Sequence, residues 1–165
     1  MGRQGVQARS DEDLAELVRE LMLVSRHIVL DVTDSYRGDD RLERSAFILL
    51  SRIEAEGPMS IGELAEAFGL DTSTVNRQTA AMIRSGVAER ILDPGGGLAR
   101  KLRITGEGHR RLGKERDWSV NGLRHVLESW TPEEIDQLTT ALTHFNRSIE
   151  DLSGKPWPRK TPHKR

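Results

Sequence analysis

The sequence predicts a mainly α-helical fold with a small β-wing, and three observations lead to it. Apolar residues recur at spacings of three and four along most of the chain, as they do on the buried face of an amphipathic helix. Capping-box pairs, in which Glu follows a short polar residue by three positions, mark where several helices begin. Around the three glycines at 95–97 the period instead approaches two, which is typical of strands.

The N-terminal part is expected to be one long helix within residues 11–37, preceded by a flexible arm at 1–10. Ser10 before three acidic residues is typical of an N-cap, because the N-terminus of a helix attracts negative charge. The segment "RGDD" ends the pattern. The apolar face of this helix includes Leu14, Leu17 and Leu21.

Three helices are then expected between residues 40 and 85. Asp40 and Glu43 have capping-box spacing and open the first helix, which Gly57 ends. Ser60 and Glu63 repeat that spacing and open the short helix "IGELAEAF". A turn of about four residues leads to "TSTVNRQTAAMIRSG", a helix with an apolar side and a polar side. The polar side carries Ser73, Asn76 and Arg77.

The glycines at 95–97 could belong to a phosphate-binding loop or to the tip of a hairpin. A phosphate loop needs a helix directly behind it, whose free N–H groups point at the anion. Here "LARKLRIT" follows with strand-like alternation, and the Lys and Ser or Thr of a nucleotide loop are missing. The hairpin is therefore favoured, with Asp93 and Pro94 as turn formers.

Helical spacing resumes over residues 106–152. Thr131, Pro132 and Glu134 combine an N-cap, a first-position proline and a capping-box acid. The last helix carries a heptad-like apolar seam, which could pack either against residues 106–130 or across a dimer axis. Residues 153–165 are rich in Pro, Lys and Arg and are expected to form a basic flexible tail. The seam consists of Ile135, Leu138, Leu142, Phe145 and Ile149.

Composition excludes several function classes. The 165 residues carry a formal net charge of −1, so any basic surface has to be local. There is no cysteine, and the five histidines have no metal-ligand spacing, so neither a metal site nor a cofactor is expected. No nucleophile elbow or paired-carboxylate motif indicates an enzyme. No apolar run is long enough for a signal peptide or a membrane span, which indicates a cytoplasmic protein.

The order helix, turn, helix, hairpin is typical of a winged helix-turn-helix domain, here expected over residues 40–105. In such domains the second helix of the pair lies in the DNA major groove. Asn can pair with adenine and Arg with guanine there, while hydroxyls and basic wing residues reach phosphates. The expected DNA contacts are Ser60, Thr72, Ser73, Thr74, Asn76, Arg77, Arg100, Lys101 and Arg103.

The segment "GPMSIGELAEAFGLDTSTVNRQTAAMIRSGVAERILDPGGGLARKLRITGEGHR" resembles the core of the multiple-antibiotic-resistance regulator (MarR) family. "ELA", "STV" followed by Arg77, and "DP" stand at the family's intervals. The resemblance implies an obligate homodimer on a pseudo-palindromic operator, usually a repressor released by a small amphipathic or phenolic ligand. It assigns dimerisation to the helices at 11–37 and 106–152, with Leu14, Leu17, Leu21 and the seam residues at the interface.

An effector cavity could be lined by aromatic and polar residues, although each of them is more readily explained as a core or surface residue. The candidates are His27, Tyr36, Phe47, Trp118 and His125.

The wing departs from the family pattern. The family commonly has Asp-Arg at the tip, with the Arg in the minor groove, whereas this chain has Gly96 and Gly97. Either Arg100, Lys101 or Arg103 makes that contact from a shifted position, or specificity depends on the recognition helix alone. The same departure keeps open an alternative function, a winged-helix protein-interaction module that does not bind DNA.

Overall fold

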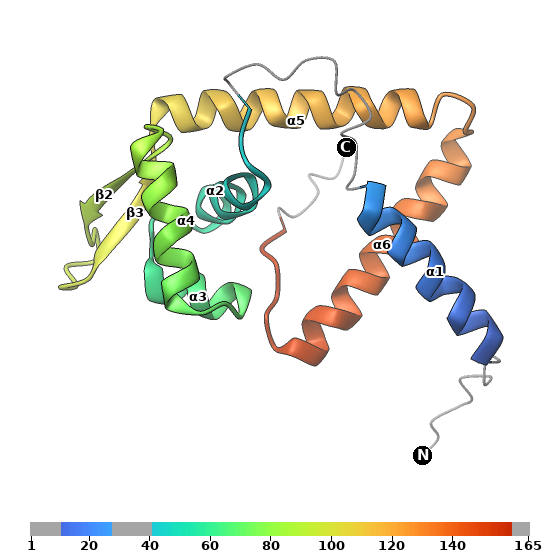
Figure 1. Cartoon of the computed structure of the whole chain (residues 1–165), viewed down its shortest axis with the longest axis horizontal. Helices are drawn as coiled ribbons and strands as arrows, with labels where there is room; N and C mark the ends of the chain where they lie inside the picture. Colours follow the sequence, from blue (N-terminus) through green and yellow to red (C-terminus); the bar gives the residue numbers. More distant parts are fainter. Residues whose placement is uncertain (1–10, 28–40, 160–165) are drawn as a thin grey trace.

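The computed structural model describes residues 11–27 and 41–159. Within these ranges the chain forms six helices and three strands, so the predicted mainly α-helical class with a small β-wing is confirmed. Figure 1 shows α5 along one side of the molecule, with α2 to α4 and the sheet at one end and α1 and α6 at the other. The elements are α1 (Asp11–His27), α2 (Arg44–Glu56), β1 (Met59–Ser60), α3 (Ile61–Phe68), α4 (Thr72–Arg84), β2 (Ala88–Leu92), β3 (Arg100–Ile104), α5 (Gly106–Val126) and α6 (Pro132–Ser153).

Local capping signals set the helix ends. The side chains of Ser60 and Thr131 each accept a hydrogen bond from the backbone N–H three residues on, and the Glu carboxylate at that position accepts one from the backbone N–H of the cap residue. Gly69 closes α3 in the left-handed conformation, with φ +63°. The start of α2 differs from the expectation, because Glu43 is itself the N-cap and makes no side-chain cap bond. Asp40, its expected partner, lies outside the described residues.

The hairpin predicted around the glycines is present and belongs to a sheet of three strands. The strand order is β1-β3-β2, and both pairs are antiparallel. Leu102 of the middle strand β3 lies opposite Met59 of β1 on one side and opposite Arg90 of β2 on the other. β1 was not predicted, since two residues are too few to show a period of two. It ties the start of α3 to the middle strand of the wing.

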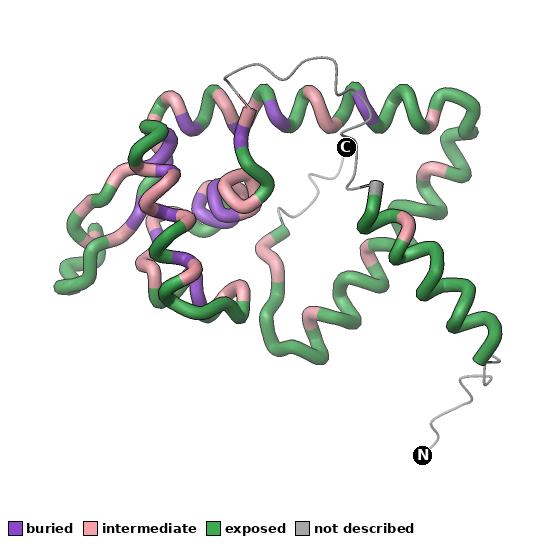
Figure 2. Tube along the Cα trace, viewed as in Figure 1, coloured by how far each residue is buried: buried purple, intermediate pink, exposed green. Residues whose placement is uncertain are grey.

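The hydrophobic core lies between α2, α3, α4, the sheet and the first half of α5. Figure 2 shows the buried residues gathered in this lobe and along the adjoining part of α5. Leu50, Leu64, Val75 and Leu112 have no measurable exposure, so each of four helices contributes to one core. This core fixes one side of α4 and leaves its other side outside.

The apolar faces of α1 and α6 remain uncovered. α6 has no buried residue over its 22 positions, and Figure 2 shows both helices almost entirely exposed. Uncovered apolar stripes of this length are uncommon on a monomer and indicate a protein partner. The large exposed side chains include Leu14, Leu17, Val18, Leu21, Leu138, Leu142, Phe145 and Ile149.

The segment after α6 differs from the predicted flexible tail. Gly154 reverses the chain with φ +66°, and the backbone carbonyl of Pro156 then accepts a hydrogen bond from Arg52 of α2 at 2.9 Å. The ring of Trp157 packs edge-on against Phe68 of α3. Residues 155–159 therefore contact the helix-turn-helix lobe.

Candidate nucleic-acid interface

Helix α4 presents one polar side to the outside. Val75, Thr79 and Met82 are buried on its inner side, at the spacing of one helix face. Asn76 and Arg77 are both exposed on the outer side. Their amide and guanidinium groups are therefore available to a duplex.

The start of α4 also leaves hydroxyl groups available. Its N-cap, Asp71, makes no side-chain cap bond, and Thr72 and Ser73 are exposed without a hydrogen-bond partner in the described part of the chain. Thr74 is half-buried. The hydroxyl of Ser60, in contrast, is already engaged, since it caps α3 by accepting from Glu63 at 3.1 Å. Thr72, Ser73 and Thr74 thus lie together at the start of α4, whereas Ser60 is the last residue of β1 and the N-cap of α3.

The three basic residues of the wing differ in their surroundings. Lys101 donates to the carboxylate of Glu63 at 3.2 Å and lies 3.5 Å from that of Asp93. Its hydrogen bond to Glu63 raises the pKa of Lys101. Arg103 pairs with Glu89 at 2.7 Å across the hairpin. Arg100 is exposed and has no partner among residues 41–159, so it is the least neutralised of the three.

The backbone conformation of the wing tip requires glycine at its turn. The carboxylate of Asp93 accepts a hydrogen bond from the backbone of Gly95 at 2.9 Å, and this bond lowers the pKa of Asp93. Gly96 follows with φ +82°, a conformation that other residues rarely adopt. A Cβ on Gly97 would come within 2.4 Å of the Asp93 carboxylate. The glycines therefore allow a compact turn closed by Asp93.

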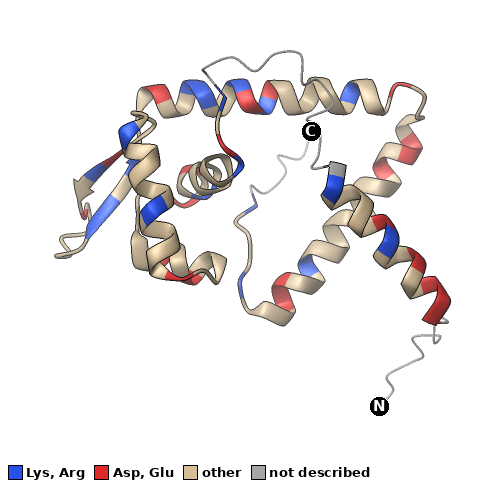
Figure 3. Cartoon of the chain, viewed as in Figure 1, with Lys and Arg blue, Asp and Glu red and all other residues tan. Residues whose placement is uncertain are grey.

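Charge is distributed unevenly over the molecule. Figure 3 shows Lys and Arg on α4 and on both long strands, while acidic residues gather at the start of α1 and on α6. The near-neutral chain thus has basic side chains on α4 and the two long strands, although Figure 3 also shows Lys and Arg along α5.

Comparison with known proteins identifies the family. The family model described as MarR family matches residues 42–97, from the start of α2 to the wing tip. The uncharacterized HTH-type transcriptional regulator YxaD of Bacillus subtilis (strain 168) is 30% identical over 128 residues, which cover 78% of this chain and 88% of that protein. This chain belongs to the MarR family. The family is one of DNA-binding transcriptional regulators.

Solved structures share the fold of this MarR-family chain. A MarR family protein from Bacillus stearothermophilus superposes with a TM-score of 0.71 at 23% identity, over 86% of this chain and 99% of that one. An organohalide-sensing transcriptional regulator, solved with 2,4-dichlorophenol bound, gives a TM-score of 0.67 at 16% identity, over 97% of each chain. The winged helix-turn-helix with flanking helices is therefore shared along nearly the whole length.

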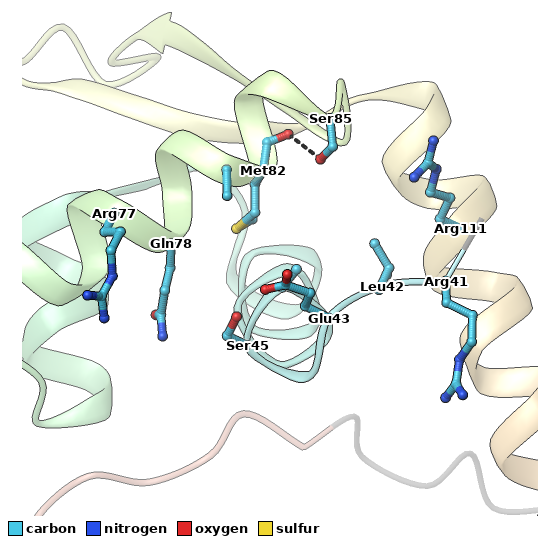
Figure 4. Close-up of a pocket in the computed structure, with 11 residues that line it drawn as sticks. Arg41, Leu42, Glu43, Ser45, Arg77, Gln78, Met82, Ser85 and Arg111 are labelled. Atoms are coloured by element: carbon cyan, nitrogen blue, oxygen red, sulfur yellow. Dashed lines mark hydrogen bonds between the residues drawn. The ribbon is translucent and has the colours of Figure 1, made fainter. Parts of the chain in front are cut away.

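A cavity of about 490 Å³ opens beside α4 in this MarR-family chain. Figure 4 shows Arg77 and Gln78 reaching toward it from α4, with Glu43 and Ser45 at the start of α2 and Arg111 on α5. The apolar part of the lining is Leu42, Ala46, Ala81 and Met82. The cavity thus combines an apolar wall with three arginines, Arg41, Arg77 and Arg111, and one acidic residue, Glu43.

The residues proposed from the sequence for an effector site do not meet at this cavity. Phe47 packs against the hydrophobic core, and the ring of Trp118 lies 5.7 Å from the guanidinium of Arg41. His125 is exposed near Glu128. The His27 side chain and Tyr36 lie outside the described residues. A pocket formed by three segments distant in sequence leaves no local pattern, which is why it could not be predicted from the sequence.

Neither a metal site nor a membrane-spanning helix is present among the described residues. Within 11–27 and 41–159, no group of His, Asp and Glu has the arrangement of a metal site. In the same ranges, no helix has the length and apolar character needed to cross a membrane.

Proposed function

We propose that this MarR-family regulator is a homodimeric repressor that reads a pseudo-palindromic operator and is released by a small amphipathic or phenolic ligand. The observation that carries the proposal is the two-sided helix α4. Its inner side is buried in the core, and its outer side offers Asn76 and Arg77. A helix held in this way can enter a major groove without moving relative to its own lobe.

Base recognition would centre on Asn76 and Arg77. An amide can make two hydrogen bonds to adenine, and a guanidinium can make two to guanine. The hydroxyls of Thr72 and Ser73, at the N-terminus of the same helix, would position the lobe on the phosphates. The wing would add Arg100, which pairs with no carboxylate among residues 11–27 and 41–159.

Dimerisation would cover the apolar faces left open on α1, α5 and α6. Leu142 and Phe145 of α6 are 45% and 39% exposed, and Val126 of α5 is 47% exposed. Burying such side chains against a second copy is favourable by about 25 cal/mol per Å². A two-fold dimer would also place two α4 helices about 34 Å apart, one turn of DNA.

The cavity beside α4 is the effector site that the geometry supports best. A ligand with an apolar ring and an anionic group would place the ring against Met82 and the anionic group near Arg77 or Arg111. Because Arg77 would contact both the ligand and the operator, ligand binding and DNA binding would compete for one side chain. The related organohalide-sensing regulator has 2,4-dichlorophenol bound.

Selection of bound duplexes from a random pool tests the proposal. We expect an enriched motif with two inverted half-sites whose centres lie about 10 base pairs, or a multiple of that, apart. Adding 2,4-dichlorophenol or salicylate should then lower the affinity of the chain for the selected duplex. A pool without enrichment would refute sequence-specific binding.

A second candidate function is a winged-helix module that binds another protein. The pairing of Lys101 and Arg103 with carboxylates favours it, because paired cations attract phosphate weakly. An electrophoretic shift with random duplex at low salt separates the two functions. Salt-sensitive retardation supports DNA binding, and its absence supports the protein-binding module.

A further inference from the structure

The short segment that follows α6 connects two parts of the molecule. We call Lys155–Arg159 the C-terminal strap. It begins directly after the reversal at Gly154, where the backbone N–H of Lys155 donates to the carbonyl of Glu150 at 3.2 Å. From there it lies against α2 and α3.

The strap is held on the lobe by a buried arginine. Arg52 of α2 is only 8% exposed, and its guanidinium donates to the Glu56 carboxylate at 2.8 and 3.0 Å and to the carbonyl of Pro156 at 2.9 Å. The ring of Trp157 lies 5.4 Å from the same guanidinium and 5.9 Å from the ring of Phe68. Burying a charge is costly unless its hydrogen bonds are satisfied, and the strap supplies one of them.

The strap is also held on α6. Arg159 makes two hydrogen bonds of 2.6 Å to the carboxylate of Glu150, a bidentate pair that lowers the pKa of Glu150. The ammonium of Lys155 lies so close to Gly69, between α3 and α4, that a Cβ there would approach it to 2.4 Å. Both ends of the strap are thus attached to α6, and its middle to the helix-turn-helix.

This arrangement closes a loop in the molecule. Along the chain, the lobe reaches α6 only through the 21 residues of α5 and the turn that follows. A single connecting helix permits hinge motion at its ends. A second connection from α6 back to α2 and α3 restricts that motion.

We infer that Arg52 and Trp157 are positioning residues, and that the C-terminal strap fixes the DNA-reading lobe relative to α6. The inference rests on the proposed function, because α6 carries the proposed dimer surface and α4 the proposed reading surface. In a dimer, the angle between lobe and α6 sets the distance between the two α4 helices. The strap would thereby determine which spacing of half-sites is bound.

The test compares the full-length protein with Trp157→Ala and with Trp157→Phe, which keeps an aromatic ring. Affinity is measured for the selected operator and for versions with one or two base pairs added to or removed from its centre. We expect Trp157→Ala to bind the selected spacing about tenfold more weakly and to discriminate less between spacings, a coupling typical of packed networks. Trp157→Phe should keep most of the discrimination.

A measurement without DNA keeps the inference separate from the proposed function. Spin labels at Arg84 of α4 and Asp136 of α6, in protein diluted with unlabelled copies, report the distance between lobe and α6. We expect a narrow distribution in the parent protein and a broader one in Trp157→Ala, with the melting temperature and mass recorded for both. Identical distributions would overturn the inference. Failure of the parent to bind any duplex would instead overturn the proposed function.

Discussion

Arg77 lies where two proposed activities meet. It is exposed on the outer side of α4 and also lines the cavity between α4, α2 and α5 (Figure 4). No other described residue pairs with it. A side chain that is free to turn either way can connect effector binding to DNA release without a large movement of the backbone.

Arg77→Ala should therefore weaken binding to the operator by about 1 to 3 kcal/mol and relax base preference at one position of each half-site. Titration of the selected duplex and of its single-base variants measures both effects. Arg84→Ala is the matched control, since Arg84 is also exposed but lies at the last residue of α4. Equal losses in the two variants would show that Arg77 contributes charge rather than recognition.

The basic residues of the wing should differ in how much they contribute to DNA affinity. Arg100→Ala should lower the slope of log affinity against log salt by about 1, because one phosphate contact is lost. Lys101→Ala should change the slope less, since Glu63 and Asp93 already share the charge of Lys101. The measurement is operator affinity at four salt concentrations. A larger change for Lys101→Ala would assign the phosphate contact to Lys101.

At the scale of elements, α5 is fitted to the wing at one glycine. A Cβ on Gly108 would lie 2.1 Å from the backbone carbonyl oxygen of Val87 and 2.7 Å from a methyl group of Ile104. The first turn of α5 can pack against the base of β2 and β3 only because this Cβ is missing.

Gly108→Ala should lower the free energy of unfolding by about 1 to 3 kcal/mol or more, since backbone has to move. Gly113→Ala in the same helix meets no atom within 4 Å and should raise stability by up to about 1 kcal/mol, because Ala favours a helix. Urea denaturation of both variants measures the two changes. If the two substitutions changed the free energy of unfolding by the same amount, the close packing of Gly108 against Val87 and Ile104 would be contradicted.

The first turn of α5 also predicts a dependence on pH. Hydrogen bonds from Arg110 and Arg111 lower the pKa of Glu107 from 4.5 to about 2. The unfolded chain binds this proton near pH 4.5 and the folded chain only near pH 2, so the stabilisation is present above pH 4.5 and is lost as the pH falls toward 2.

Glu107→Gln should therefore unfold with a weaker pH dependence between about pH 4.5 and 2 than the parent protein. Urea denaturation at a series of pH values gives the slopes. Glu133→Gln, in the first turn of α6, removes a similar carboxylate that has no arginine partner among the described residues. If both variants changed the slope equally, the arginine pairs at Glu107 would have no special effect.

The whole molecule combines a compact winged helix-turn-helix lobe with two helices, α1 and α6, whose apolar faces are exposed to solvent. α1 and α6 expose apolar faces along their length (Figure 2), although the lobe buries its own core completely. Such a division is expected where folding of the lobe and assembly of two copies are separate steps.

Leu142→Asp should raise the dissociation constant of the proposed dimer about a hundredfold or more, because each copy loses a buried side chain and gains a charge at the seam. Operator binding should fall with it, since one lobe makes too few contacts. Sedimentation equilibrium measures the mass. Thr140→Asp adds the same charge on the opposite face of α6 and should remain dimeric. A dimeric Leu142→Asp would exclude the seam from the interface.

Elements whose signals are local could be predicted from the sequence. Capping boxes at Ser60 and Thr131 predicted the starts of α3 and α6, and both are confirmed. The apolar spacing in α4 predicted which face is buried, and therefore that Asn76 and Arg77 are exposed. These features depend on residues three or four positions apart, so the pattern is visible without the fold.

Features formed by residues far apart in sequence became visible only in the folded chain. The partner of Lys101 lies 38 positions away, and the contact between Arg52 and the strap spans 104. The cavity beside Arg77 and the two-residue strand β1 exist only because separate segments meet. Composition predicted a basic flexible tail, whereas Pro156 and Trp157 pack against the lobe, because the buried Arg52 and the ring of Phe68 offer them contacts.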